Sequence, residues 1–334
     1  MVLGNGKITN LMKYEIIPIA GDASFRTFYR FSSNKKSKII VLSKKEKYKN
    51  LVAYSAINKF LVKNKITAPK LYSYNFSKGI IVIEDFGDLS FHKILLKKKN
   101  KLAIYKKLVD FLLKIQKIKP KEKIKKVNIG MHKVEKYSKK HLFKESDLFF
   151  DWYLTLFLSK KKALYIKKKS KKILTALYNK LNFPNSYLVH RDYHTQNLMQ
   201  INKKRIGVID SQDALIGNPA YDLVSLIDDV RIKTSLKLKN QIYKYYLKKT
   251  SKIYRINSKK FLEDFNILSV QRSLKIIGIF SRLFKRDKKI YYLKLIPYTW
   301  QLLEMRMKSE IFLKLKKILD KNISKRFRKT IIKK

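Results

Sequence analysis

The sequence predicts an α+β protein of two lobes, in which a small β-rich N-terminal lobe precedes a larger helical C-terminal lobe. Short runs rich in Ile, Val, Phe and Tyr, separated by turn residues, dominate residues 14–87. After Gly87, apolar residues recur at spacings of three and four, as they do on one face of a helix. We therefore place the N-terminal lobe at residues 1–86, the C-terminal lobe at residues 87–334 and a hinge near residues 84–88. A cleft between two such lobes is the natural place for a ligand.

The N-terminal lobe is expected to be a small, mostly antiparallel sheet with one helix. Its strand-like runs are residues 14–33, 37–45 and 79–87. Residues 49–64, between the second and third runs, have helical periodicity, and Pro69 keeps that helix from continuing.

The C-terminal lobe is expected to be helical around one short strand and one hairpin. Residues 102–118 predict a strongly amphipathic helix, and residues 145–181 predict largely helical structure up to Pro184. Residues 186–190 predict the strand and residues 197–212 the hairpin, and helix is expected from there to the end.

The composition excludes sites that depend on cysteine, and together with the apolar pattern it indicates where the protein is located. There is no cysteine, so disulfides, zinc–thiolate sites and thiol nucleophiles are excluded, and we expect a cytoplasmic protein. The N-terminal residues lack the basic start and apolar run of a signal peptide. The longest apolar patch, residues 147–158, has only 12 residues, whereas a spanning helix needs about 20. No transmembrane segment is expected.

A formal net charge of +55 raises the question of a nucleic-acid or membrane partner. The charge comes mostly from Lys spread along the chain, whereas a dedicated binding surface would concentrate it and would favour Arg. A solvated basic surface is the preferred interpretation, and a nucleic-acid partner is not expected. The basic, amphipathic residues 314–334 leave one alternative from another class, a nucleic-acid or membrane-surface binding protein with weak peripheral membrane contact through this tail.

The stretch "HRDYHTQNLM" carries the strongest chemical signal. His190, Arg191, Asp192 and Asn197 fit the pattern H-R-D-x-x-x-x-N, and Asp210 follows at the end of the strand-like run "IGVID". An amide and a carboxylate oxygen at these positions can hold a hard cation beside a third carboxylate, which can accept a proton from a substrate hydroxyl. Phosphoryl transfer needs this combination of a positioned nucleophile and neutralised phosphate charge.

Four stretches together resemble a known superfamily: "GDASFRTFYRF", "IVIEDFGD", "HRDYHTQNLM" and "GVIDSQDALIGNPAYDLVSL". The resemblance is to the aminoglycoside phosphotransferase and choline kinase-like superfamily, and most to the branch that phosphorylates the anomeric hydroxyl of N-acetylmuramate and N-acetylglucosamine. It implies a two-lobed protein-kinase-like fold, a cytoplasmic enzyme of cell-wall recycling, ATP as co-substrate, Mg²⁺ and a small sugar as acceptor. The alternative within the same fold is an aminoglycoside, choline or other amino-alcohol kinase.

The resemblance assigns roles to residues of the C-terminal lobe. Asp192 would orient the acceptor hydroxyl or take its proton, and Asn197 and Asp210 would hold magnesium. Where protein kinases have D-F-G, this chain has Asp210-Ser211-Gln212, and no A-P-E follows. These departures weigh against a protein substrate.

Five more residues are candidates for shaping the site or contacting the substrate. His190 and Arg191 would shape the loop, and Asp222 would brace it by accepting backbone N–H bonds, with a helix N-cap as the alternative. His194 would contact the substrate or a phosphate. Trp152 would stack on a sugar ring, with a place in the core as the alternative.

The N-terminal lobe would supply the nucleotide contacts. Ser24 and Arg26 would bind phosphate from a loop with little glycine, although a plain hairpin with an exposed arginine is the alternative. Lys44 would be the phosphate-binding lysine, with coincidence in a lysine-rich run as the alternative. The main chain from Glu84 to Phe86 would bind adenine, and a simple turn at the strand end is the alternative.

Overall fold

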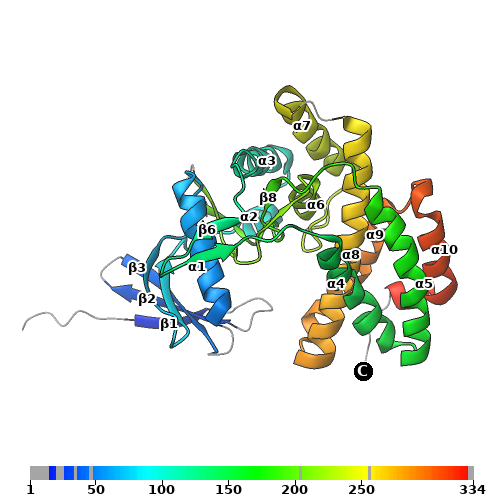
Figure 1. Ribbon diagram of the computed structural model, residues 1–334, viewed down its shortest axis with the longest axis horizontal. Coiled ribbons are helices and arrows are strands. Elements are labelled where there is room, and N and C mark those ends of the chain that lie inside the picture. The colour runs from blue at the N-terminus through cyan, green and yellow to red at the C-terminus, as the bar shows by residue number, and fades with distance from the viewer. Residues whose placement is uncertain are drawn as a thin grey trace, which may run out of the picture.

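The computed structural model describes residues 15–19, 26–33, 36–44, 48–202, 205–254 and 257–329. Figure 1 shows a sheet with one helix at one side of the molecule and a larger helical body at the other. Ser24, predicted to contact phosphate, lies outside the described residues.

The N-terminal lobe is built on a five-stranded sheet in the order β1-β2-β3-β5-β4, with all neighbours antiparallel. Its strands are β1 (Glu15–Ile19), β2 (Arg26–Ser33), β3 (Lys36–Ser43), β4 (Leu71–Asn75) and β5 (Ile80–Glu84). Strand alternation turns Ile39 and Val41 of β3 and Ile81 of β5 to the buried side, where they pack with Leu51 and Tyr54 of helix α1 (Tyr48–Lys63). The predicted antiparallel sheet with one helix is therefore present.

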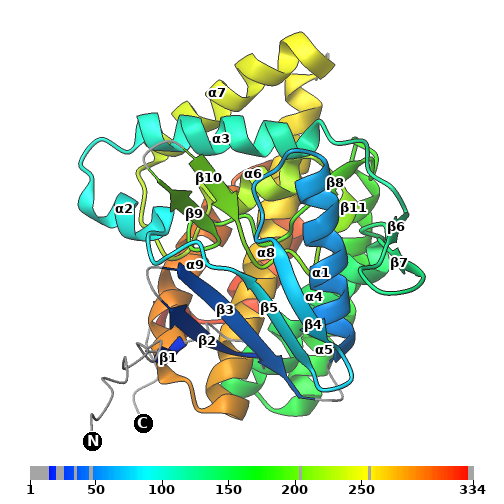
Figure 2. The ribbon, with the colours of Figure 1, turned by 90° about the vertical axis from the view of Figure 1, so that its left-hand side faces the viewer.

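Helix α1 also joins the two lobes. Its residues Ile57 and Leu61 belong to the large apolar core of the C-terminal lobe, whereas Leu51 belongs to the core of the sheet. Figure 2 shows α1 beside β4 and β5, with the helical body behind the sheet. Strand β5 ends at Glu84 and the next helix begins at Phe91, so the connection between the lobes passes through the predicted hinge residues 84–88.

The C-terminal lobe packs its helices around one long central helix, α8, which contacts α4, α6 and α9 (Figure 1). The helices are α2 (Phe91–Lys97), α3 (Leu102–Gln116), α4 (Lys139–Leu148), α5 (Lys160–Asn179), α6 (Ala220–Ile227), α7 (Leu236–Tyr254), α8 (Ser258–Asp287), α9 (Ile296–Arg306), α10 (Leu313–Asn322) and α11 (Lys325–Lys329). The short strands are β6 (Lys123–Lys125), β7 (Met131–Lys133), β8 (Tyr187–Val189), β9 (Leu198–Ile201), β10 (Arg205–Val208) and β11 (Leu215–Gly217). Single-turn segments are η3 (Leu154–Leu156), η4 (Ile290–Leu295) and η5 (Glu310–Phe312).

Residues 145–181 are less regular than the periodicity predicts. Helix α4 ends at Leu148, a π-helical segment η2 (Phe149–Tyr153) follows, and α5 begins only at Lys160. Gly278 of α8 lies against this junction, because a Cβ atom there would be 2.3 Å from the carbonyl carbon of Leu148. The close approach of the two backbones is a tertiary contact that periodicity alone does not reveal.

The basic C-terminal tail is packed against the rest of the lobe. Leu315 and Leu319 of α10 are buried, and the Arg328 guanidinium lies over the Trp300 ring, 5.0 Å from its centroid. The apolar face that peripheral membrane contact would need therefore faces the protein core. Across the described residues, no helix combines the length and apolar character needed to cross a membrane.

Candidate active site between the lobes

The loop that carries Asp192 links β8 to β9 and is braced by Asp222 of α6. The two carboxylate oxygens of Asp222 accept the backbone N–H groups of His190 at 2.7 Å and of Arg191 at 2.9 Å. These bonds hold Arg191 in the left-handed backbone region, at a φ of 72°. The cap position of α6 is occupied by Pro219, without a side-chain cap bond. Asp222 is thus placed where it would brace the loop, and burial raises its pKa to about 6.

Two further contacts tie the loop to the hairpin that follows it. The Nε2 atom of His190 lies 3.0 Å from the carbonyl oxygen of Ile209, next to Asp210, so it must carry the proton. The Asn197 side-chain amide donates to the Asp192 carbonyl oxygen at 3.0 Å. These bonds set the relative positions of Asp192, Asn197 and Asp210. His190 therefore connects the loop to the hairpin.

Asp192 is ionised in this environment. Burial works to raise the pKa of Asp192, but the nearby positive charges of Lys275 and Arg191 outweigh it and hold the pKa below its ordinary value. Arg272 contributes to the same field. An ionised carboxylate accepts a hydrogen bond well but is a weak base, which suits the orientation of a hydroxyl more than its early deprotonation.

A buried acid, Glu145 of α4, holds the cations around Asp192 in place. The Arg191 Nη2 atom and the Tyr137 hydroxyl donate to Glu145. The Nζ atom of Lys275 lies 3.1 Å from its Oε1 atom, and Gln271 Nε2 donates to Oε2 at 2.9 Å. Burial alone would raise the pKa of Glu145, yet the charges of Lys275 and Arg191 lower it to about 2. Arg191 thus shapes the loop through Glu145.

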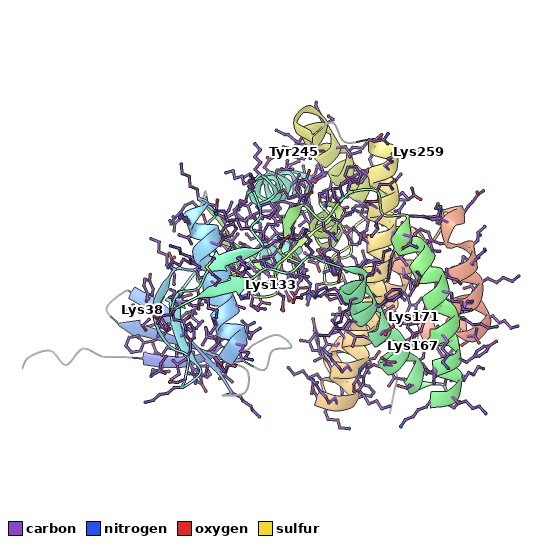
Figure 3. The ribbon with its side chains drawn as sticks, viewed as in Figure 1. Lys38, Lys133, Lys167, Lys171, Tyr245 and Lys259 are labelled. Atoms are coloured by element: carbon purple, nitrogen blue, oxygen red, sulfur yellow. The ribbon has the colours of Figure 1, made fainter. Side chains whose placement is uncertain are left out.

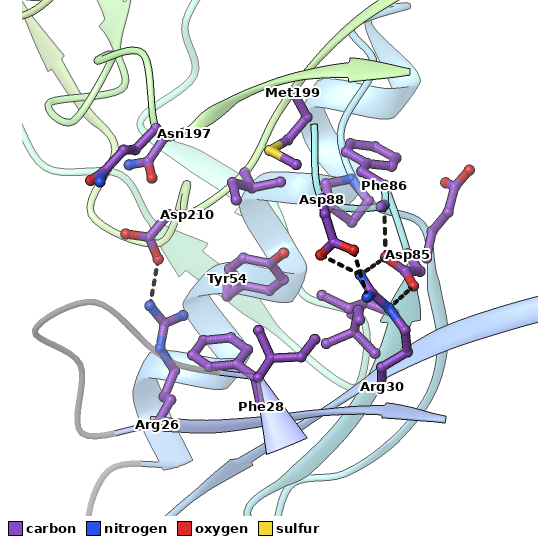
Figure 4. A pocket seen from close by; sticks show the side chains of 18 residues that line it. Arg26, Phe28, Arg30, Tyr54, Asp85, Phe86, Asp88, Asn197, Met199 and Asp210 are labelled. Carbon is purple, nitrogen blue, oxygen red and sulfur yellow. Dashed lines mark hydrogen bonds and ion pairs between the residues drawn. The ribbon is translucent and has the colours of Figure 1, made fainter. Parts of the chain in front are cut away.

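A cavity of about 290 Å³ lies between the sheet, the hinge and this loop. Figure 4 shows Asn197 and Asp210 at one end of the cavity and Asp85 and Asp88 at the other. At the hinge end, Arg30 of β2 pairs with Asp85 at 2.6 Å and with Asp88 at 2.9 Å. The apolar middle of the cavity is lined by Ile19, Phe28, Ile39, Ile83, Phe86, Met199 and Ile209. A flat apolar group between two polar ends fits such a cavity.

The structure brings three of the predicted nucleotide contacts into the cavity walls and leaves one outside. Arg26, Glu84 and Phe86 line the cavity, and Arg26 pairs with Asp210 (Figure 4). Lys44 is exposed just beyond the end of β3 and is not part of the cavity wall. The physical reason is strand alternation, which turns Val41 and Ser43 inward instead.

On its other side the loop borders two further hollows that share Asp192, Lys275 and Ile279 in their walls. The larger has a volume of about 630 Å³ and the smaller about 70 Å³. His194 is buried in the wall of the smaller one, where burial and the charge of Arg231 lower its pKa to about 3, so its ring is neutral. Asp192 thus lines the two hollows on this side of the loop, whereas Asn197 of the same loop lines the cavity of about 290 Å³ on the other side.

Trp152 does not take part in either hollow. It lies half-buried in the π-helical segment η2, and neither wall includes it. The indole that packs at the centre of this aromatic cluster is Trp300, whose N–H donates to the Tyr153 hydroxyl at 2.9 Å. Stacking of Trp152 on a sugar is not supported by this placement.

The sequence did not point to Glu145 or to the cations of α8 as site residues. Glu145 appeared only within a predicted helix, and its partners lie 46 residues away at Arg191 and 130 residues away at Lys275. One signal was available, because Arg272 and Lys275 interrupt an otherwise apolar stretch of α8 that is buried on all sides. Lysine and arginine are rarely buried unless they pair with an anion or serve a functional site, so their presence in a buried helix indicates one of these roles.

Asn197 and Asp210 fit a magnesium ion in the kind of atoms that they offer. Both present oxygen atoms on the same wall, and Asn197 donates its N–H to the loop, which leaves its side-chain oxygen for other partners. Magnesium usually takes only one or two side chains and completes its shell with phosphates and water, so a larger cluster of acids is not required. Arg26 at Asp210 adds a cation where phosphate charge would gather.

The comparisons with known proteins agree with this geometry. Residues 15–254 match the phosphotransferase enzyme family, which is most of the chain. The chain belongs to this family. A Pseudomonas aeruginosa member named N-acetylmuramate/N-acetylglucosamine kinase is 27% identical over 293 residues, which cover 87% of this chain and 83% of that protein. The chain is thus a small-molecule phosphotransferase, as the sequence predicts.

Solved structures of kinases share the fold. An aminoglycoside phosphotransferase with ADP bound matches with a TM-score of 0.59 at 14% identity, over 88% of this chain and 93% of its own. An ethanolamine kinase from Plasmodium vivax matches with a TM-score of 0.62 at 12% identity, over 92% of this chain and 85% of its own. At these identities the likeness concerns the fold, and it confirms the predicted two-lobed α+β architecture.

Proposed function

We propose that this family member transfers the γ-phosphoryl group of ATP to the anomeric hydroxyl of N-acetylmuramate, N-acetylglucosamine or both. The observation that carries the proposal is the position of Asp192, ionised and shared by the walls of the acceptor hollows. Through Asn197 the same loop reaches the nucleotide cavity and Asp210. The names of its relatives support an amino-sugar acceptor, and ADP in a structural neighbour supports ATP as the donor.

The residues would divide the work of an in-line transfer. Asp192 accepts a hydrogen bond from the acceptor hydroxyl and aligns it for attack, and it takes the proton as the new P–O bond forms and the bond to ADP breaks. Asn197 and Asp210 would hold magnesium, which supplies neutralisation of phosphate charge when bound. Arg26 adds positive charge from the N-terminal lobe, and the hinge residues Glu84 and Phe86 border the place of the adenine.

The wall of the smaller hollow favours an uncharged or anionic group over a cationic one. Arg272 and Lys275 line the smaller hollow, where Asp192 is the one acid among the wall residues. Aminoglycosides and choline are cations and would meet like charge here. The amino-alcohol alternative is therefore not favoured by this geometry.

A function in binding nucleic acid or membrane surfaces has no comparable support. Figure 3 shows Lys38, Lys171 and Lys259 on different sides of the molecule, so basic side chains extend from both lobes. These three lysines are exposed, as expected of a solvated basic surface. The tail that suggested membrane contact buries its apolar residues in the lobe.

The proposal is tested by acceptor-dependent release of ADP. Purified protein with Mg-ATP is offered N-acetylmuramate, N-acetylglucosamine, choline and an aminoglycoside in parallel. Turnover with an amino sugar, and none with the cations, is the expected result. Turnover with choline or the aminoglycoside alone would replace the proposal by the alternative within the same fold.

A further inference from the structure

Arg272 of α8 is a buried arginine without a counter-ion. Its side chain is 4% exposed, and it makes no hydrogen bond or ion pair with any residue in the described ranges. Its Nε atom is fully buried and unpartnered. Burial of a guanidinium without a partner costs folding free energy, so a role in function is the expected reason for an arginine at this position.

The surroundings of Arg272 form a small chamber in which Asp192 is the one acid among the wall residues, and no hydrogen bond joins the two side chains. The chamber is the hollow of about 70 Å³ next to Asp192. Its apolar walls are Ile276, Ile279, Phe280, Leu283 and Tyr292. The neighbouring cation Lys275 is already engaged by Glu145 at 3.1 Å. Asp192, the remaining acid in the wall, lies in the loop where the acceptor hydroxyl is proposed to sit.

The chamber lies beside the larger hollow. Residues 272, 275, 276, 279 and 283 fall on one face of α8 by their helical spacing, and this face forms one wall of the chamber. Both hollows have Asp192, Lys275 and Ile279 in their walls, so a group bound in the smaller one lies next to a ligand in the larger one. The volume suits a group of a few atoms with an apolar side and a negative charge.

We propose that Arg272 binds a carboxylate of the acceptor, so that the site recognises an anionic sugar while its reacting hydroxyl faces Asp192. This proposal rests on the proposed function. N-acetylmuramate has such a group, a lactyl ether with a methyl and a carboxylate, and N-acetylglucosamine has a hydroxyl in its place. The planar fork of arginine matches a carboxylate in two parallel hydrogen bonds. The nucleotide is a less fitting source of the anion, because Arg272 is not in the wall of the nucleotide cavity.

The test compares the two sugars in the wild type, Arg272→Gln and a control. Arg286→Gln is the matched control, because Arg286 lies on the same helix, is exposed and pairs with Asp287 at 2.7 Å. For Arg272→Gln we expect the KM for N-acetylmuramate to rise about ten- to a hundredfold relative to the KM for N-acetylglucosamine, whereas any change in kcat that acts through Asp192 should be the same for both sugars. Arg286→Gln should leave both sugars unaffected. Equal loss on both sugars, or no change on either, would overturn the proposal.

Thermal melting separates recognition from a structural role. Removal of an unpaired buried charge should leave the melting temperature of the ligand-free protein equal or higher, and N-acetylmuramate should raise it in the wild type but not in Arg272→Gln. A lower melting temperature of ligand-free Arg272→Gln would instead indicate a structural role. If the wild type phosphorylates neither sugar, the proposed function fails. If it phosphorylates N-acetylglucosamine and Arg272→Gln changes nothing, only the assignment of Arg272 fails.

Discussion

One buried arginine on the acceptor side of the Asp192 loop differs from the arginines of the nucleotide cavity, and also from Arg191 on its own side, which pairs with Glu145. In the nucleotide cavity, Arg26 pairs with Asp210 and Arg30 pairs with Asp85 and Asp88. On the acceptor side, Arg272 is buried with no ion pair to any described residue. The charge of a paired arginine is already neutralised by a carboxylate of the protein. The charge of an unpaired buried arginine can instead be neutralised by a negatively charged ligand. The difference supports the proposed division into a donor side and an acceptor side.

The largest effect is expected at Asp192, which lines the acceptor hollows and lies five residues before Asn197 in the same loop. Asp192→Asn keeps the shape of the loop but removes the acceptor of the hydroxyl proton, so kcat should fall about 10²- to 10⁴-fold. Calorimetry should show ADP binding unchanged, because Asp192 is absent from the wall of the nucleotide cavity. Turnover at the wild-type rate in Asp192→Asn would contradict the role of Asp192 at the acceptor hydroxyl.

Glu145→Gln tests what holds the acceptor-side cations. Without the carboxylate, Arg191 and Lys275 lose their buried anionic partner, and the free energy of unfolding should drop by about 3–5 kcal/mol in urea titrations. The control Glu135→Gln affects an exposed carboxylate that pairs with His141 at 3.0 Å and should cost at most about 1 kcal/mol. Equal losses for the two variants would contradict the role of Glu145.

The loss of unfolding free energy in Glu145→Gln should depend on pH. The pKa of Glu145 is about 2 in the folded protein and 4.5 ordinarily, so its ionised form stabilises the fold fully above about pH 4.5. That stabilisation is lost as the pH falls towards 2. The difference in unfolding free energy between wild type and Glu145→Gln should therefore shrink over this range. A difference that grows on acidification would contradict the pairing.

Gly278→Ala should disturb the acceptor side selectively. An added Cβ would meet the backbone of Leu148 at 2.3 Å, so α8 must move and the unfolding free energy should fall by about 1–3 kcal/mol. An alanine in an uncrowded helix would instead stabilise by up to about 1 kcal/mol, so the sign of the change is diagnostic. We also expect a higher KM for the sugar with an unchanged KM for ATP.

The smallest effect concerns the cation of the nucleotide side. Arg26→Gln should raise the KM for ATP by about tenfold, since Arg26 stands beside Asp210 at the end of the cavity where phosphate charge would gather. Lys44→Gln, at an exposed position outside the cavity, should leave this KM unchanged. A larger rise of the KM for ATP in Lys44→Gln than in Arg26→Gln would instead indicate that Lys44 binds the phosphate.

Local patterns predicted the architecture and the loop well, because both depend on short-range spacing. The strands and helix of the N-terminal lobe follow from period-two and helical patterning, and His190 to Asn197 form one continuous motif. Sequence reasoning failed where tertiary contacts decide. Lys44 faces outward because of strand register, Glu145 meets Arg191 only in the fold, and Arg272 is recognisable only once its lack of a partner is seen.

Phosphorus NMR of the product tests the central claim most directly. After turnover of N-acetylmuramate with Mg-ATP, the account predicts a new phosphate signal split by the single proton at the anomeric carbon and lost on mild acid treatment. A phosphate coupled to the two protons of the exocyclic carbon and stable to acid would contradict it, because the anomeric hydroxyl would then not be the group that Asp192 aligns.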